Sequence, residues 1–230
     1  MAHCIAIIGA GGKTTAMMTL ARALESQRVL MTTTTHIYPV SPPESRELLV
    51  NPTSEELRWA LEKPGIVCAG NLEGEGKLSR LEPGLLARAG QWADWIVCEA
   101  DGAKRLPLKL HREEEPVIPP ETERCLLVLG LSAVDQPVSE VVHRYHLHPA
   151  WEQNPGTTVE ETVLCRCAWD GIRAGGLPLD QYRVLLNQAE TPRQKEIGNL
   201  AARMLRREGV DCRVGSLWED PESILAWLLP

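Results

Sequence analysis

The sequence predicts an α/β protein whose sheet is mostly parallel and carries helices on both faces. Short apolar runs rich in β-branched residues alternate along the chain with segments of helical periodicity, which is the pattern of βαβ units. The first of these runs leads directly into a glycine-rich loop, as happens where a strand of such a fold meets a ligand. The expected strands are residues 3–8, 28–32, 65–69, 94–99, 124–129, 182–187 and 210–214.

Helices are expected between these strands because apolar residues recur at positions i, i+3, i+4 and i+7. The first stripe is Met17, Leu20, Ala21 and Leu24, and the second is Ile197, Leu200, Ala201, Met204 and Leu205. Helix starts are signalled by Thr53 with Glu56, by Thr191 with Gln194, and by Asp220 before Pro221, and a helix end by Gly209. The stretches 70–80 and 102–123, rich in glycine and proline respectively, are expected to be loops.

Length and composition narrow the class of protein. The 230 residues are expected to form one domain, 1–230, with a helical insertion at about 134–180. The chain has 24 Lys and Arg against 31 Asp and Glu, a net charge of −7, and no basic block, which argues against nucleic acid as a partner. Its apolar runs are shorter than the roughly 20 residues that cross a bilayer, so no membrane association and a cytoplasmic location are expected. The seven Cys are expected to be mostly free and buried.

The strongest functional signal is the loop at residues 9–15. It reads Gly9, Ala10, Gly11, Gly12, Lys13, Thr14 and Thr15. Glycines let successive backbone N–H groups turn toward one point, and the following helix presents its unpaired N–H groups to an anion. Lys13 adds a positive charge, and Thr14 adds a hydroxyl ligand for Mg²⁺. The spacing is shorter than the strict Gly-x₄-Gly-Lys pattern, but the flanking strand and helix predict a P-loop NTPase-like fold that binds ATP or GTP.

Four threonines and a histidine follow the second expected strand, at its carboxyl end. In open α/β sheets this is the edge where ligands bind. Thr32 and Thr33 suit the strand itself, because threonine is a good strand residue. Thr35 and His36, with Thr34 beside them, are the candidates to face a substrate or to act as a switch.

Acidic residues follow the fourth strand. Glu99 and Asp101 alternate with Ala100, so they lie on the same side and suit joint work at one metal or at a nucleophile. Both are candidate catalytic residues together with Lys13, and Asp101 is preferred as the Mg²⁺ ligand. Lys104 and Arg105 come next and are candidate substrate or switch residues.

Two further clusters are ambiguous. His143 and Arg144 are candidate anion contacts, whereas His143, His146 and His148 together leave metal binding open. Cys165 and Cys167 also leave it open, although two Cys one residue apart on a helix point to different faces.

The last signal is Asn187 with Glu190 after the sixth strand. A strand followed by Asn-x-x-acid is the form by which guanine-specific NTPases read the base, so both residues are candidate nucleotide contacts. Gln188 and Glu190 replace the usual Lys and Asp, which leaves the choice between ATP and GTP open.

Taken together and in this order, these motifs resemble those of the YqeC-type family, accessory proteins of selenium-dependent molybdenum hydroxylases. The glycine loop alone is shared with Mur-type ligases, whereas its combination with Thr-Thr-Thr-Thr-His and Glu-Ala-Asp-Gly-Ala-Lys is specific. The resembling segments are residues 9–15, 32–36, 99–104, 107–109, 115–120, 143–144 and 185–189. The resemblance implies a P-loop NTPase fold and, as partners, a nucleotide and either a molybdenum hydroxylase subunit or a cofactor-maturation protein.

Two functions of different classes remain open from the sequence. In the first, Mg²⁺–NTP binds at residues 9–15 and its hydrolysis serves cofactor maturation. In the second, the protein is a nucleotide-gated binding module whose loops 32–45 and 102–120 order around the γ-phosphate and grip a client. A third function, an ATP-dependent small-molecule ligase or kinase, needs an acceptor site, and the ligase also needs further domains.

Overall fold

The computed structural model describes residues 1–74 and 76–229. Contacts divide the chain into two compact units. Unit 1 consists of Met1–Ile7, Ala16–Asp101 and Val117–Arg124, and unit 2 of Ile8–Thr15, Gly102–Pro116 and Cys125–Pro230. The chain therefore passes between the units several times. The expectation of one domain over residues 1–230 stays a prediction.

Unit 1 is built on a mainly parallel sheet with the strand order β1-β7-β2-β5-β6-β3. Its parallel members are β1 (His3–Gly9), β7 (Trp95–Glu99), β2 (Arg28–Thr33) and β5 (Gly65–Glu73), with β4 (Glu47–Val50) also parallel to β5. Two short antiparallel strands extend it, β6 (Lys77–Ser79) and β3 (His36–Ile37). Glu99 stands opposite both Ile7 and Thr33, so three parallel strands end together.

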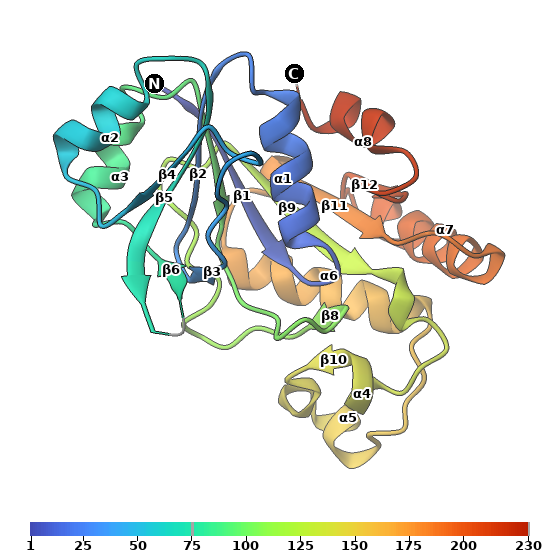
Figure 1. Ribbon diagram of the computed structural model, residues 1–230. Helices are drawn as coiled ribbons and strands as arrows, with labels where there is room; N and C mark the ends of the chain where they lie inside the picture. Colours follow the sequence, from blue (N-terminus) through green and yellow to red (C-terminus); the bar gives the residue numbers. More distant parts are fainter. Residues whose placement is uncertain (75, 230) are drawn as a thin grey trace. The chain divides into compact units, whose positions relative to one another are not determined.

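Helices cover this sheet because each presents an apolar stripe. The helices α2 (Ser54–Ala60) and α3 (Pro83–Ala89) pack Leu57 and Leu85 into a core with Leu30 and Ile96 of the sheet. Residues that alternate with these along the strands are buried too, and so is the Met17 stripe of α1 (Lys13–Ala23). Figure 1 shows α1 running along the sheet. The predicted α/β class, with helices on both faces, is confirmed.

Unit 2 contains a second run of parallel strands, in the order β12-β11-β9. These are β9 (Arg124–Gly130), β11 (Tyr182–Asn187) and β12 (Cys212–Val214). The helices α6 (Glu161–Gly175) and α7 (Pro192–Arg207) contact each other, and α8 (Pro221–Leu228) follows β12. Asn187 pairs with Gly130, so the carboxyl ends of β9 and β11 lie side by side.

The stretch between β9 and α6 is made of short elements. They are a 3₁₀ turn (Leu131–Ala133), α4 (Val138–Val141), β10 (Val142–His143), a second 3₁₀ turn (Tyr145–Leu147) and α5 (Pro149–Gln153). Figure 1 shows α4, β10 and α5 gathered beside β8 (Leu108–Lys109), which pairs in parallel with β10. A further 3₁₀ turn (Leu179–Gln181) precedes β11.

The helix starts predicted from the sequence are confirmed. Thr53 with Glu56 and Thr191 with Gln194 form capping boxes at α2 and α7, and the Asp220 carboxylate accepts from the Ser223 N–H at the start of α8. All seven predicted strands are present. The expectation of a loop over residues 70–80 is wrong, because β5 runs to Glu73 and pairs antiparallel with β6 (Lys77–Ser79). A Cβ on Gly70 would come 2.7 Å from the Ser79 carbonyl oxygen of β6. The glycine there permits close strand pairing, and the short β8 likewise corrects the loop expected over 102–123.

Among the described residues, no helix is both long and apolar enough to cross a bilayer. All seven Cys are buried thiols outside disulfide bonds, as expected.

Candidate functional site

Hydrogen bonds within the glycine loop of unit 2 and to the neighbouring strand β9 hold the loop in place. The Ala10 N–H donates to the Val128 carbonyl oxygen at 2.8 Å, which holds the loop against the neighbouring strand. The Lys13 ammonium folds back over the loop and donates to the Gly9 carbonyl oxygen at 2.8 Å. Lys13 is only 6% exposed, so its charge lies at the loop and not in open solvent.

Two glycines of the loop are required by their surroundings. Gly11 and Gly12 have φ values of +78° and +131°, which side chains rarely adopt. A Cβ on Gly12 would lie 2.3 Å from the Asn187 Nδ2 atom, and one on Gly11 would lie 2.4 Å from the Gly130 Cα atom. The loop can therefore have this shape only with glycine at both positions.

The same two residues leave donors available. Within residues 1–74 and 76–229, the N–H groups of Gly11 and Gly12 donate no hydrogen bond to any protein acceptor. Both residues are half-buried, and α1 begins immediately after them at Lys13. Adjacent free N–H groups, a helix N-terminus and an ammonium group together favour an anion.

Asn187 connects this loop to the end of β12. Its Nδ2 donates to the Gly11 carbonyl oxygen at 2.9 Å, and its Oδ1 accepts from the Leu217 N–H at 3.0 Å. Sequence reasoning placed Asn187 at the nucleotide, and the structure places it directly on the glycine loop. Glu190 is exposed three residues later, and the Gln188 side-chain oxygen accepts from the Ser132 hydroxyl at 2.8 Å.

In unit 1, the threonine run closes the carboxyl end of β2. The Thr32 hydroxyl donates to the Ala69 carbonyl oxygen and the Thr33 hydroxyl to that of Glu99, so both side chains bond to neighbouring strands. The Thr35 N–H donates to the Thr33 hydroxyl at 2.9 Å. His36 belongs to β3 and forms an exposed pair with Glu73 at 3.2 Å.

The acidic segment of unit 1 is buried. Glu99 is 7% exposed and Asp101 is 0% exposed. Between them, the Ala100 N–H donates to the Ile7 carbonyl oxygen at 2.9 Å, which aligns this segment with the last unit 1 residue of β1. The chain continues from Ile7 into the glycine loop within two residues.

An ion cluster of Lys109, Glu115 and Arg144 occupies another part of unit 2. The Lys109 ammonium, 1% exposed, donates to Glu115 at 3.0 Å and to the Gly102 carbonyl oxygen at 2.7 Å. The Arg144 guanidinium donates two hydrogen bonds to the same carboxylate, at 2.6 and 3.0 Å. These partners lower the pKa of Glu115 to about 2, with Arg144 the largest cause. Arg144, expected as an anion contact, thus binds a protein carboxylate.

His143 lies beside this cluster in β10. Burial is the largest cause, and together with the positive charges of Arg144, Lys109 and Lys104 it lowers the pKa of His143 to about 4. At neutral pH His143 is therefore uncharged, so it acts there as a neutral hydrogen-bonding group. Lys104 and Arg105 are exposed on the loop before β8, and both have positive φ.

Sequence reasoning did not assign a role to Lys109, Glu115 or the pair His111–Asp170. The Asp170 carboxylate of α6 accepts from the His111 backbone N–H at 2.9 Å and lies 2.7 Å from its Nδ1 atom. A local sequence pattern cannot show that His111 and Asp170, which are 59 positions apart, form a pair. In the part of the chain that the structure describes, no three His, Cys, Asp or Glu side chains gather as a metal group.

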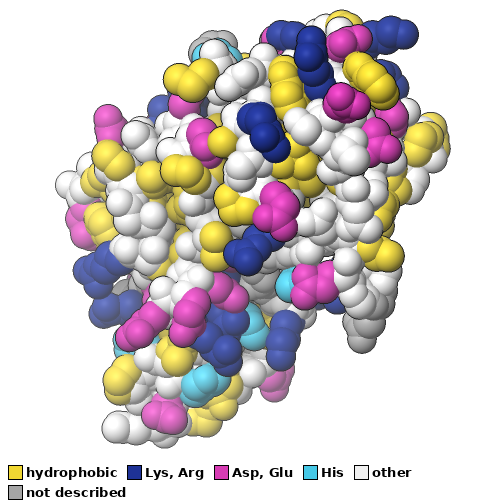
Figure 2. All heavy atoms as spheres, turned by 90° about the vertical axis from the view of Figure 1, so that its left-hand side faces the viewer, with side chains coloured by type: hydrophobic (Ala, Val, Ile, Leu, Met, Phe, Trp, Pro, Cys, Tyr) yellow, Lys and Arg dark blue, Asp and Glu magenta, His cyan; other side chains and the backbone are white. Residues whose placement is uncertain are grey.

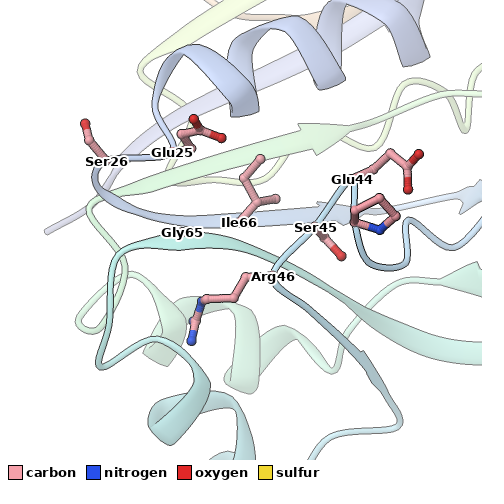
Figure 3. Close-up of a pocket in the computed structure, with 8 residues that line it drawn as sticks. Glu25, Ser26, Glu44, Ser45, Arg46, Gly65 and Ile66 are labelled. Atoms are coloured by element: carbon pink, nitrogen blue, oxygen red, sulfur yellow. The ribbon is translucent and has the colours of Figure 1, made fainter.

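One pocket in unit 1 lies away from the carboxyl edge of the sheet. Its volume is about 460 Å³, and Figure 3 shows its lining from Glu25 and Ser26, before β2, to Gly65 at the start of β5. Arg46 points out of it toward α2, where its guanidinium donates to the Ala60 carbonyl oxygen. The pocket is at the amino-terminal edge of these strands, opposite the end that carries Thr33 and Glu99, so it is not the expected ligand edge.

The surface charge is mixed on the face that Figure 2 shows. Lys and Arg side chains there are interspersed with Asp and Glu, without a continuous area of one sign.

A family model and a curated relative point to the same family. The family model described as "YqeC protein" matches residues 5–146. The protein YqeC of Escherichia coli (strain K12), described as uncharacterized, is 34% identical over 149 residues, which cover 61% of this chain and 57% of that protein. The chain thus matches little more than half the length of this relative. The crystal structure of HypB from Helicobacter pylori in complex with nickel aligns with 99% of this chain and 86% of that one, at a TM-score of 0.44 and 10% identity.

The ion cluster makes stability depend on pH. Replacing Glu115→Gln leaves a buried ammonium and a guanidinium without their carboxylate, so we expect the free energy of unfolding at pH 7 to fall by about 3 kcal/mol. Because folding lowers the pKa of Glu115 from 4.5 to about 2, its contribution is complete above about pH 4.5 and is lost as the pH falls toward 2. Urea unfolding at pH 7 and at pH 3 measures this.

The control is Glu196→Gln, which removes an exposed partner of Arg193 and should change stability by less than about 0.5 kcal/mol. An equal effect of Glu115→Gln at both pH values would contradict the account.

Proposed function

The chain belongs to the YqeC family, and on this premise we propose that it is a Mg²⁺-dependent nucleotide-binding protein that hydrolyses ATP or GTP. The observation that carries the proposal is the pair of open N–H groups on Gly11 and Gly12, directly before α1 and beside the Lys13 ammonium. Phosphate oxygens are the ligands that such a set of donors favours.

In this proposal the phosphates bind at residues 9–15. The N–H groups of Gly11 and Gly12 donate to phosphate oxygens, and Lys13 neutralises part of their charge. Lys13 already donates to the Gly9 carbonyl oxygen, so its ammonium is held at the loop before a ligand arrives. A preordered donor loses less conformational entropy on binding than a mobile surface lysine.

We include Mg²⁺ in the proposal because the chain offers oxygen ligands of the kind that this ion prefers. A hydroxyl and carboxylates are the protein ligands that Mg²⁺ prefers, and the sequence offers Thr14 and Asp101 as such. When bound to a nucleotide, the ion supplies neutralisation of charge that develops on the phosphates. Glu99 is proposed to orient the attacking water.

The client is proposed from the family resemblance. A nucleotide cycle of this kind would serve the maturation of a selenium-dependent molybdenum hydroxylase, by contact with a hydroxylase subunit or a cofactor-maturation protein. The resemblance supports the partner class, and the loop geometry supports the nucleotide.

The first test removes the charge at the loop. Lys13→Ala should raise the dissociation constant for Mg²⁺–ATP and Mg²⁺–GTP by at least about a hundredfold, because it deletes the ammonium that faces the phosphates. Isothermal titration calorimetry measures both constants. Lys63→Ala, which removes an exposed lysine in unit 1, serves as the control. A folded Lys13→Ala protein with unchanged affinity would remove the phosphate-loop assignment.

The second test separates the two carboxylates. Asp101→Asn should weaken nucleotide binding only when Mg²⁺ is present, because the metal ligand is lost. Glu99→Gln should retain affinity and reduce turnover, because it alters the water and not the binding. Titrations with and without Mg²⁺, together with phosphate release, distinguish these effects. If neither substitution changes affinity or turnover, the acidic segment has only a structural role.

The third test separates an enzyme from a nucleotide-gated module. We expect measurable phosphate release from the protein alone, because the proposal assigns the catalytic groups to this chain. Turnover is measured alone and with a molybdenum hydroxylase subunit. Turnover that is absent alone and restored by the subunit would favour the gated module.

A further inference from the structure

The turn after β12, residues 215–220, exposes a tryptophan side chain to solvent, although the residues just before it are buried. Trp218 is 85% exposed, whereas its neighbours Ser216 and Leu217 are 4% and 5% exposed. An indole ring is one of the largest apolar side chains, and proteins usually bury much of it. The ring of Trp218 is therefore available for contact while its backbone is part of the folded body.

The backbone of this turn is held rigidly. The Ser216 hydroxyl accepts from the N–H groups of Trp218 and Glu219, each at 3.3 Å, and the Ser216 carbonyl oxygen accepts from the Asp220 N–H at 2.9 Å. The Gly215 N–H donates to the Leu186 carbonyl oxygen at 3.0 Å, which ties the turn to β11. The exposed position of Trp218 is thus set by its anchored turn.

The turn is also tied directly to the glycine loop. Asn187 accepts from the Leu217 N–H with one end of its amide and donates to the Gly11 carbonyl oxygen with the other. Asn187 is 4% exposed, so this bridge lies in the interior. Trp218 follows Leu217 in the chain, so the Asn187 side chain links the turn that carries Trp218 to the proposed phosphate site.

We propose that Trp218 is the surface on which the base of the bound nucleotide stacks. The inference rests on the proposed function, because it takes the phosphates to be at residues 9–15. A nucleotide bound there extends its sugar and base away from the loop, and Trp218, which follows the residue bound by Asn187, carries an exposed aromatic ring. Stacking on an aromatic ring is tolerant of base identity, since every base has a π-face.

The polar groups nearby fit a site that holds a base without strong selection. Gln188 accepts from the Ser132 hydroxyl, so its side-chain oxygen is already engaged. Glu190 is exposed and is the remaining candidate for reading the edge of a base. Trp218 would then contribute affinity for ATP and GTP alike, and little discrimination between them.

The test compares ligands with and without a base. Isothermal titration calorimetry is carried out with Mg²⁺–ATP, Mg²⁺–GTP and Mg²⁺–tripolyphosphate on the wild type, Trp218→Ala and Trp218→Phe. Trp218→Ala should raise the dissociation constants for ATP and GTP by about tenfold or more and leave that for tripolyphosphate within about twofold. Trp218→Phe, which retains a ring, should recover most of the affinity. Trp59→Ala, at a 63% exposed tryptophan of α2, is the matched control and should change none of the constants.

The outcomes distinguish this inference from the proposed function. If the wild type binds tripolyphosphate and ATP but Trp218→Ala binds both as the wild type does, the stacking proposal is overturned and the phosphate site stands. An equal loss of ATP and tripolyphosphate affinity in Trp218→Ala would also overturn stacking, because it would show a general disturbance of the loop. A wild type that binds neither ligand overturns both proposals.

Discussion

Three hydrogen bonds to protein groups hold the backbone of the glycine loop, whereas the Gly11 and Gly12 N–H groups donate to no acceptor among the described residues. The Ala10 N–H is bound by β9, the Gly11 carbonyl oxygen by Asn187, and the Gly9 carbonyl oxygen by Lys13. A Cβ at position 12 would collide with the Asn187 amide and one at position 11 with Gly130, so glycine at both positions lets the loop lie this close to its neighbours. The donors for an anion and the shape of the loop thus follow from one packing constraint.

The parallel strands of unit 2 place further residues at the same edge as the glycine loop. Because β9, β11 and β12 run in parallel, Gly130, Asn187 and the turn at 215–220 emerge at one edge of the unit 2 sheet. The side-chain amide of Asn187 then ties two of these ends together. This edge is where ligands of open α/β sheets bind, and it holds the glycine loop, Glu190 and Trp218.

The sequence predicted what is local and left out what depends on distant pairing. Capping boxes at Thr53 and Thr191 involve residues three positions apart, and the glycine loop is continuous, so both were visible in the chain. Asn187 bridges to Gly11 across 176 positions, and Arg144 meets Glu115 across 29, and no periodicity reports either. Strands of two residues, such as β8, are too short for an alternating pattern. Arg144 was expected to bind an anion because its charge was visible and its carboxylate partner was not.

Amide NMR observes the Gly11 and Gly12 N–H groups, which we propose bind phosphate, one by one. Spectra of ¹⁵N-labelled protein are recorded during titration with Mg²⁺–ATP and followed by amide hydrogen exchange. We expect the Gly11 and Gly12 resonances to shift downfield and the two amides to exchange more slowly in the bound state, because each N–H becomes a hydrogen-bond donor to the ligand. Binding that shifts other resonances and leaves both of these amides unchanged in position and exchange would contradict it.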